Sequence, residues 1–163
     1  MIRTTVVLAA VALATAMAPL CAADPVAPQQ DQPCPPTADE ATTMPTTPAP
    51  TAGANTPLQC HQGRWQAVAL PADPSDRWWS TGPVIALRGQ GMRNPNLMSG
   101  KWSGTPLGPG NRCHVEQRAV ISAGVVSAPT AIDGAPDQTL HFDVAPTASS
   151  VEFSGYCLWT RLG

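Results

Sequence analysis

Cysteine and histidine are the residues of this sequence that most directly suggest chemistry. Two cysteines are each followed by a histidine, in Cys60-His61 and Cys113-His114. Zinc ligands usually stand two to four residues apart on a turn, whereas adjacent residues of a strand point to opposite faces. The third histidine, His141, is distant in the sequence, and no Cys-x-x-Cys or His-Glu-x-x-His pattern occurs. We therefore expect no metal site and no other cofactor.

A serine nucleophile would need a histidine and a carboxylate within reach. The sequence leaves one such set open, namely Ser103, His141 and Asp143. Ser103 does not occupy the middle of a Gly-x-Ser-x-Gly turn, and His141 and Asp143 alternate on one expected strand, where both would face solvent. We expect no enzymatic activity, and a small secreted hydrolase remains the alternative.

Paired carboxylates could cleave a glycosidic bond if they faced each other across a cleft. Glu116 and Glu152 are the only glutamates after residue 76, and each lies in a strand-like run. Arg118 and Arg161 could pair with them across strands, which is the commoner use of such residues. We expect cross-strand ion pairs here.

Tryptophan is unusually frequent among the aromatic residues, with five tryptophans against two phenylalanines and one tyrosine. An indole offers a large rigid surface with one polar handle, which suits binding as well as packing. Trp78 and Trp79 are adjacent and cannot both point inward from one extended strand. Arg77, Trp78 and Trp79 are therefore the candidate binding surface, and a structure with both indoles buried would remove this support.

Charge and composition narrow the possible classes of protein. The chain has 163 residues, a net charge of −2, and only 12% charged residues, about half the usual fraction. Its basic residues are scattered, so nucleic acid is not an expected partner. With 19 prolines and 13 glycines, the sequence argues against a helical bundle.

The N-terminal residues 1–23 read as a signal peptide. Arg3 precedes an apolar run over residues 6–17, which is too short to span a membrane, and small residues follow it. We expect export with cleavage after residue 23, with cleavage after residue 22 as the alternative, and no membrane span in the mature protein. Acylation of Cys21 is an alternative that Leu20 disfavours, since a small residue should precede a lipidated cysteine.

The mature chain divides into three segments by composition. Residues 24–57 are rich in proline and threonine and lack aromatic residues, Leu and Ile, so we expect a disordered stalk, O-glycosylated or a plain linker. Residues 58–76 read as a small stapled β unit and a linker. Residues 77–163 contain short β-prone runs separated by turns, the clearest being the alternation over 140–144. We predict an all-β fold, a small antiparallel β-sandwich or barrel.

Four cysteines remain after residue 23, and an even number in an exported chain indicates two disulfides. Three pairings are open. Position favours Cys34 with Cys60 and Cys113 with Cys157, because each pair would then staple one unit. Each closed loop would stabilise the fold by about 3.5–4 kcal/mol in the chain-entropy model.

The end of the sequence carries a recognisable pattern. VAPTASSVEFSGYCLWTR at residues 144–161, MSGKW at 98–102 and Cys113 together resemble the end of a β module common in exported actinobacterial proteins. CHQGRW at residues 60–65 is similar to the Cys-x-x-Gly-x-Trp hairpins of surface and pilus-tip proteins. The first of these resemblances covers residues 94–163 and implies an extracellular, disulfide-linked β module without a catalytic role.

These observations together predict a secreted cell-envelope protein that binds rather than reacts. Its expected partner is an envelope glycan or another surface protein, with attachment to the cell wall as one option. A passive structural surface protein is the other alternative, and it would present no binding surface.

Overall fold

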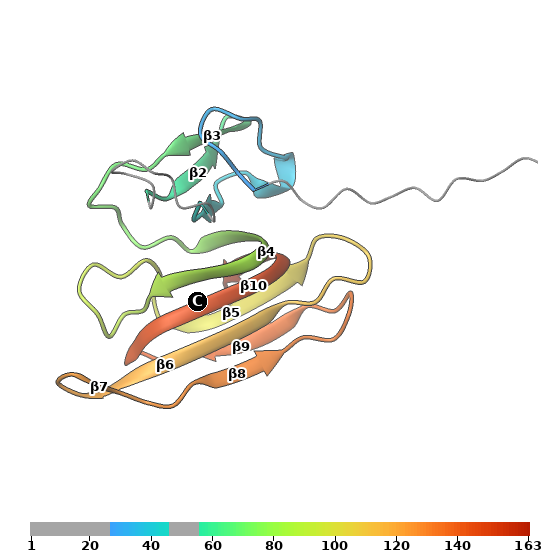
Figure 1. Ribbon diagram of the computed structural model, residues 1–163. Coiled ribbons are helices and arrows are strands. Elements are labelled where there is room, and N and C mark those ends of the chain that lie inside the picture. The colour runs from blue at the N-terminus through green and yellow to red at the C-terminus, as the bar shows by residue number, and fades with distance from the viewer. Residues whose placement is uncertain (1–26, 46–55) are drawn as a thin grey trace, which may run out of the picture.

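The computed structural model describes residues 27–45 and 56–163, so the predicted signal peptide at 1–23 lies outside them (Figure 1). Within these ranges the chain forms one short 3-10 helix and ten strands, and the predicted all-β fold is confirmed. The elements are η1 (Pro36–Ala38), β1 (Thr42–Thr43), β2 (Leu58–His61), β3 (Arg64–Ala67), β4 (Arg77–Arg88), β5 (Gly100–Pro106), β6 (His114–Ser122), β7 (Val125–Val126), β8 (Thr130–Asp133), β9 (Leu140–Val144) and β10 (Ala148–Arg161).

The strands build one mixed sheet that does not close. Its main path runs β3-β2-β1-β4-β10-β5-β9, and β6 joins β10, β7 and β8 off this path. Pairing is antiparallel except between β1 and β4, which run parallel with Thr42 opposite Trp78. The small β unit (residues 27–45 and 56–67) and the β domain (residues 77–163) therefore share a sheet through β1 and β4.

Strand β10 is the centre of the β domain, because the sheet forks along it. Its first half, residues 148–154, pairs with β6, and its second half, residues 157–161, pairs with β5. Strand β4 follows the opposite edge over residues 150–160. The two branches, β6–β8 and β5–β9, can be followed in Figure 1 below β4 and β10.

The fork depends on a glycine and a disulfide. A bulge separates Phe153 from Gly155 in the pairing with β4, and Gly155 has a φ of 92°, in the left-handed region. A Cβ at Gly155 would also collide with the carbonyl oxygen of Arg112. Two residues further on, Cys157 forms the predicted disulfide with Cys113, just before β6, with a Cα–Cα distance of 5.9 Å. The disulfide thus ties the two strands together where the sheet divides.

The core of the β domain is aromatic. Phe153 and Trp159 stack with ring centroids 4.2 Å apart, and Phe142 meets both rings edge-on. The Trp159 Nε1 donates a hydrogen bond to the Ser80 Oγ at 2.9 Å, which satisfies the indole inside the core. The alternation predicted for β9 is confirmed, since Leu140, Phe142 and Val144 are buried and the residues between them are exposed.

The small β unit corrects the predicted boundary of the disordered stalk. Residues 27–45 are not part of such a stalk, since they fold with β2 and β3 and carry η1 and β1. The predicted disulfide between Cys34 and Cys60 is present, and Ala38 and Ala41 are fully buried. The composition of this segment gave a wrong prediction of disorder for residues 27–45, because small alanines can fill a core whose large side chains come from other segments. Residues 24–26 and 46–55 lie outside the described residues.

Candidate functional site

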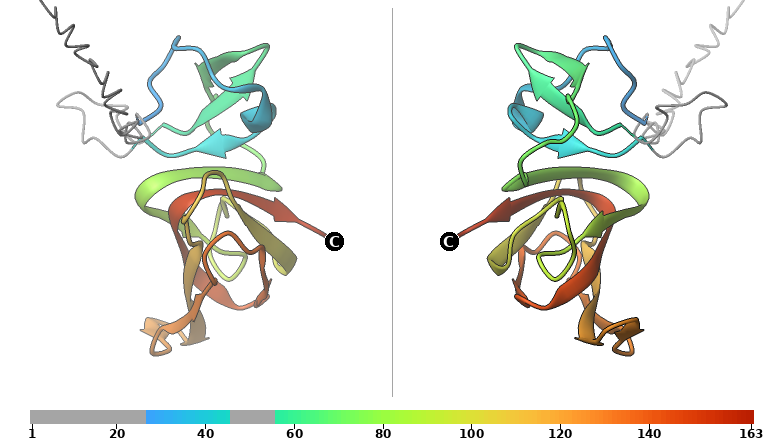
Figure 2. Two further views of the ribbon diagram at one scale, coloured as in Figure 1. Left: turned by 90° about the vertical axis from the view of Figure 1, so that its right-hand side faces the viewer. Right: turned by 90° about the vertical axis from the view of Figure 1, so that its left-hand side faces the viewer.

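The predicted exposure of one indole at Trp78 or Trp79 is wrong. Trp78 is 1% exposed and Trp79 is 3% exposed. They do point to opposite faces of β4, but both faces are covered. Trp78 joins the core of the β domain, and Trp79 enters the core of the small β unit, with its ring edge-on to Tyr156 at 5.5 Å. Figure 2 shows β4 on the side of the β domain that meets the small β unit, which explains how both indoles are buried.

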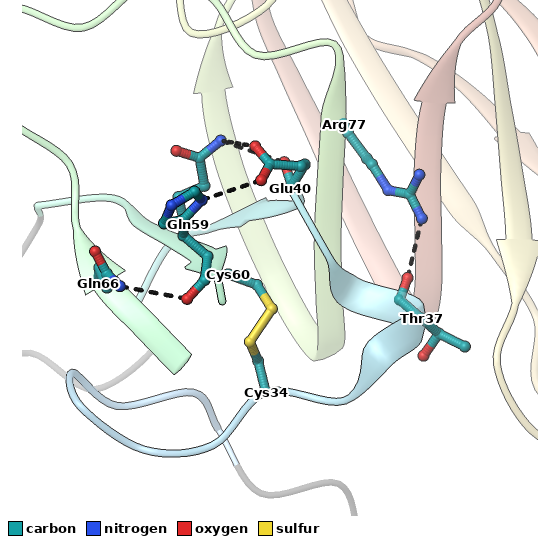
Figure 3. The surroundings of a disulfide bond; sticks show 8 residues. Cys34, Thr37, Glu40, Gln59, Cys60, Gln66 and Arg77 are labelled. Carbon is teal, nitrogen blue, oxygen red and sulfur yellow. Dashed lines mark hydrogen bonds and ion pairs between the residues drawn. A yellow bond between two sulfur atoms is a disulfide. The ribbon is translucent and has the colours of Figure 1, made fainter. Parts of the chain in front are cut away.

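Arg77 joins the two bodies instead of forming an exposed contact. Its Nη2 donates a hydrogen bond to the carbonyl oxygen of Thr37 at 3.0 Å, across to η1 (Figure 3). Its Nε is buried and has no hydrogen-bond partner among the described residues. The predicted surface of Arg77, Trp78 and Trp79 therefore does not exist as an exposed patch.

The junction between the two bodies is instead hollowed into a groove of about 890 Å³, here called the junction groove. One wall is the small β unit, the second is the connecting segment of residues 68–76, here called the strap, and the third is β4 with the loop after it. The volume lies within the usual range of ligand pockets. The polar residues lining it are Glu40, Thr42, Gln59, Asp73, Ser75, Asp76, Arg77, Arg88, Asn94 and Asn96.

Ser75 fixes the end of the strap to the other two walls. Its hydroxyl accepts hydrogen bonds from the Thr42 Oγ1 at 3.0 Å and the Arg77 N–H at 3.2 Å. Its own N–H donates to the carbonyl oxygen of Asn96 at 2.8 Å, and its carbonyl oxygen accepts from the Trp78 Nε1 at 3.1 Å. Ser75 therefore fixes this end of the strap within the junction groove without the help of a ligand.

The middle of the strap, unlike its Ser75 end, is not held by hydrogen bonds to other described residues. Residues 69–74 make no backbone hydrogen bond with any residue that the structure describes. Backbone N–H and C=O groups are strong hydrogen-bonding groups, and here they border a cavity instead of a neighbouring strand. The strap thus borders the junction groove with carbonyl groups and four N–H groups that have no backbone partner among the described residues, since Pro71 and Pro74 carry no N–H.

Charged side chains of both signs line the junction groove. The Glu40 carboxylate lies 3.1 Å from the His61 Nδ1 and accepts from the Gln59 amide at 3.4 Å (Figure 3). Within the described part of the chain, Asp73 and Arg88 form no ion pair. These two groups on facing walls are thus the ones left to meet a charged ligand.

The serine set left open by the sequence is not assembled. Ser103 lies directly opposite His141 in the β5–β9 pairing, but its hydroxyl donates to the carbonyl oxygen of Thr160 at 3.4 Å. His141 makes no side-chain hydrogen bond to Ser103 or Asp143 within the described ranges. The arrangement lacks the contacts that a triad requires.

A second row of the same residue types was missed by sequence reasoning. Asp133, His114 and Ser154 lie opposite one another on β8, β6 and β10, and the His114 Nδ1 is 2.7 Å from the Asp133 Oδ1. No hydrogen bond joins Ser154 to His114 in the described residues, and none of the three lines the junction groove. Strand register produces this row, and no local sequence pattern encodes it.

The glutamates have other partners than those expected. Glu116 and Glu152 stand opposite each other on β6 and β10. Arg118 donates to Glu116 at 3.1 Å along the same strand, and Arg161 lies 3.4 Å from Asp76 at the rim of the junction groove. The expectation of cross-strand pairs between these arginines and glutamates is therefore wrong.

Three further observations bear on the class of protein. In the described ranges, no group of three or more His, Cys, Asp or Glu side chains is arranged to hold a metal ion. The same ranges contain no helix with the length and apolar character needed to cross a membrane. No protein-family model, curated protein or solved structure matches this chain.

Proposed function

We propose that this chain is an exported, non-catalytic binding protein of the cell envelope, of the actinobacterial kind that its C-terminal pattern resembles. The observation that carries the proposal is the junction groove, where two bodies meet that each contain one disulfide. Its ligand would be an envelope polymer or a protein partner. The lining of the groove includes Arg77 and Trp78 but not Trp79, so the groove takes the place of the exposed patch expected from these three residues.

Two observations support export. Both disulfides are formed, and such bonds persist mainly in oxidising compartments. The N-terminal residues 1–23 have the composition of a signal peptide. Mass spectrometry of the natively produced protein tests this part of the proposal. We expect a chain that starts at Asp24 and is lighter by four hydrogens than its reduced form. Retention of residues 1–23, or free thiols, would contradict export.

A blocked groove tests the binding function. Ala69 is exposed and lines the junction groove, so Ala69→Trp would fill part of it. Ala131 is an exposed alanine on β8, away from the groove, and Ala131→Trp is the matched control. Both variants and the parent protein would be tested against an array of envelope oligosaccharides and against a library of random peptides.

The expected result is binding to members of one set, reduced about tenfold or more by Ala69→Trp, equal to at least about 1.4 kcal/mol, and unchanged by Ala131→Trp. Binding that Ala69→Trp leaves intact would place the ligand elsewhere. Failure of the parent protein to bind either set would favour the passive structural alternative.

A further inference from the structure

We infer that the ligand of the junction groove is an extended peptide segment, recognised mainly through its main chain and carrying a basic side chain. This inference rests on the proposed function and narrows its ligand to one class. Three features of the groove support it, namely the absence of an exposed indole, the unbonded backbone of the strap, and the carboxylate of Asp73, which forms no ion pair with a described residue.

The burial of the aromatic side chains argues against a glycan as the ligand of the junction groove. Flat aromatic faces are the usual platform for the apolar face of a sugar ring, and they need to be exposed. In this protein all the indole and phenyl side chains are buried, and Tyr156, which is half-buried, packs against Trp79. The buried set is Trp65, Trp78, Trp79, Trp102, Phe142, Phe153 and Trp159. Trp78 is the one aromatic residue in the described lining of the junction groove, and with 1% of its surface exposed it offers no stacking surface.

The strap has what a peptide main chain requires. Ala69, Leu70, Ala72 and Asp73 each keep a backbone N–H with no backbone acceptor among the described residues, and the carbonyl groups of 69–74 are equally unbonded. Peptide recognition by strand addition uses such groups for affinity. The two alanines have short side chains, which allow another backbone to approach closely. The facing wall adds side-chain amides, including that of Asn94.

Most charged side chains of the lining already have partners. Asp76 lies 3.4 Å from Arg161, Glu40 lies 3.1 Å from His61, and Arg77 donates to the carbonyl oxygen of Thr37. Asp73 and Arg88 are left, and Asp73 lies on the strap, where the peptide main chain would pair. Asp73 is exposed on the strap and forms no ion pair with a described residue, so it is the expected partner of a lysine or arginine of the ligand.

Selection from a displayed library of random dodecapeptides, with the mature disulfide-bonded protein as target, tests the inference. The enriched peptides would be synthesised with a normal backbone and with alternate N-methylated residues. We expect N-methylation to weaken binding about tenfold or more, because it removes several main-chain donors. We expect the same loss with Ala69→Trp and no change with Ala131→Trp.

A charge variant tests the basic side chain. Asp73→Lys should weaken the enriched peptides about threefold to tenfold, and more at low than at high ionic strength. Asp143, an exposed carboxylate on β9 outside the groove, provides the control variant Asp143→Lys, which should bind as the parent does.

The other possible outcomes contradict the inference, either alone or together with the proposed function. If no peptide is enriched, or if N-methylation has no effect, main-chain recognition is wrong. If Ala69→Trp binds the peptides as well as the parent does, the groove is not their site. If envelope oligosaccharides bind in a groove-dependent manner and peptides do not, the proposed function stands while this inference fails. If neither class binds, both fail.

Discussion

Replacing Trp79 by alanine is expected to unfold the small β unit and leave the β domain folded. Truncation of a buried tryptophan to alanine costs about 3–5 kcal/mol. Among the described residues, the buried core of the small β unit has only Leu58 and Trp65 as large apolar side chains besides Trp79, and Leu107, Tyr156 and Leu158 of the β domain pack against it while half-buried. A core this small cannot absorb such a loss, whereas the β domain keeps its own aromatic cluster.

Hydrogen exchange followed by mass spectrometry measures this effect for each segment. A local loss of about 3 kcal/mol corresponds to exchange about a hundredfold faster. We expect that increase for amides of β2 and β3 in Trp79→Ala, with the amides of β10 exchanging as in the parent. Trp79→Phe keeps most of the packing and should give an intermediate effect. Equal acceleration in β10, or unchanged protection in β2, would refute the reasoning.

Three other experiments have defined outcomes. Replacing Cys113 and Cys157 together by serine should lower the free energy of unfolding by about 4 kcal/mol in urea denaturation, and a loss below about 1 kcal/mol would show that the disulfide is not a main support of the fork. Gly155→Ala should lower the free energy of unfolding by about 3 kcal/mol or more, because of the positive φ and the collision with the Arg112 carbonyl oxygen. Gly124→Ala, at a φ of 75° in open space, should lower it by about 1 kcal/mol. Equal melting temperatures for the two alanine variants would contradict this account of the fork. A fluorophosphonate probe should leave Ser154 unlabelled, with Ser154→Ala as the control, and labelling would favour the hydrolase alternative.

The features predicted correctly are those that local patterns encode. Alternation over residues 140–144 is a property of one strand, and it holds. The two disulfide pairs were favoured by position along the chain, and both are present. The all-β class followed from short runs separated by turns and from the absence of a helical period.

The features missed depend on contacts between distant segments. A sequence pattern shows that Trp78 and Trp79 point to opposite faces, but not that a second body covers one of those faces. That body includes residues 27–45, whose proline and threonine content suggested disorder when they were considered alone. The junction groove is drawn from four separate stretches of chain, so no single motif could have indicated it.

Amide chemical-shift mapping tests most directly whether the junction groove is the binding site. The mature protein, labelled with nitrogen-15, would be titrated with the tightest peptide from the selection. We expect the largest shifts at the amides of the strap and at Asn96, with small changes elsewhere. Shifts confined to β6, β8 and β10 around His114 and Ser154 would contradict binding in the junction groove.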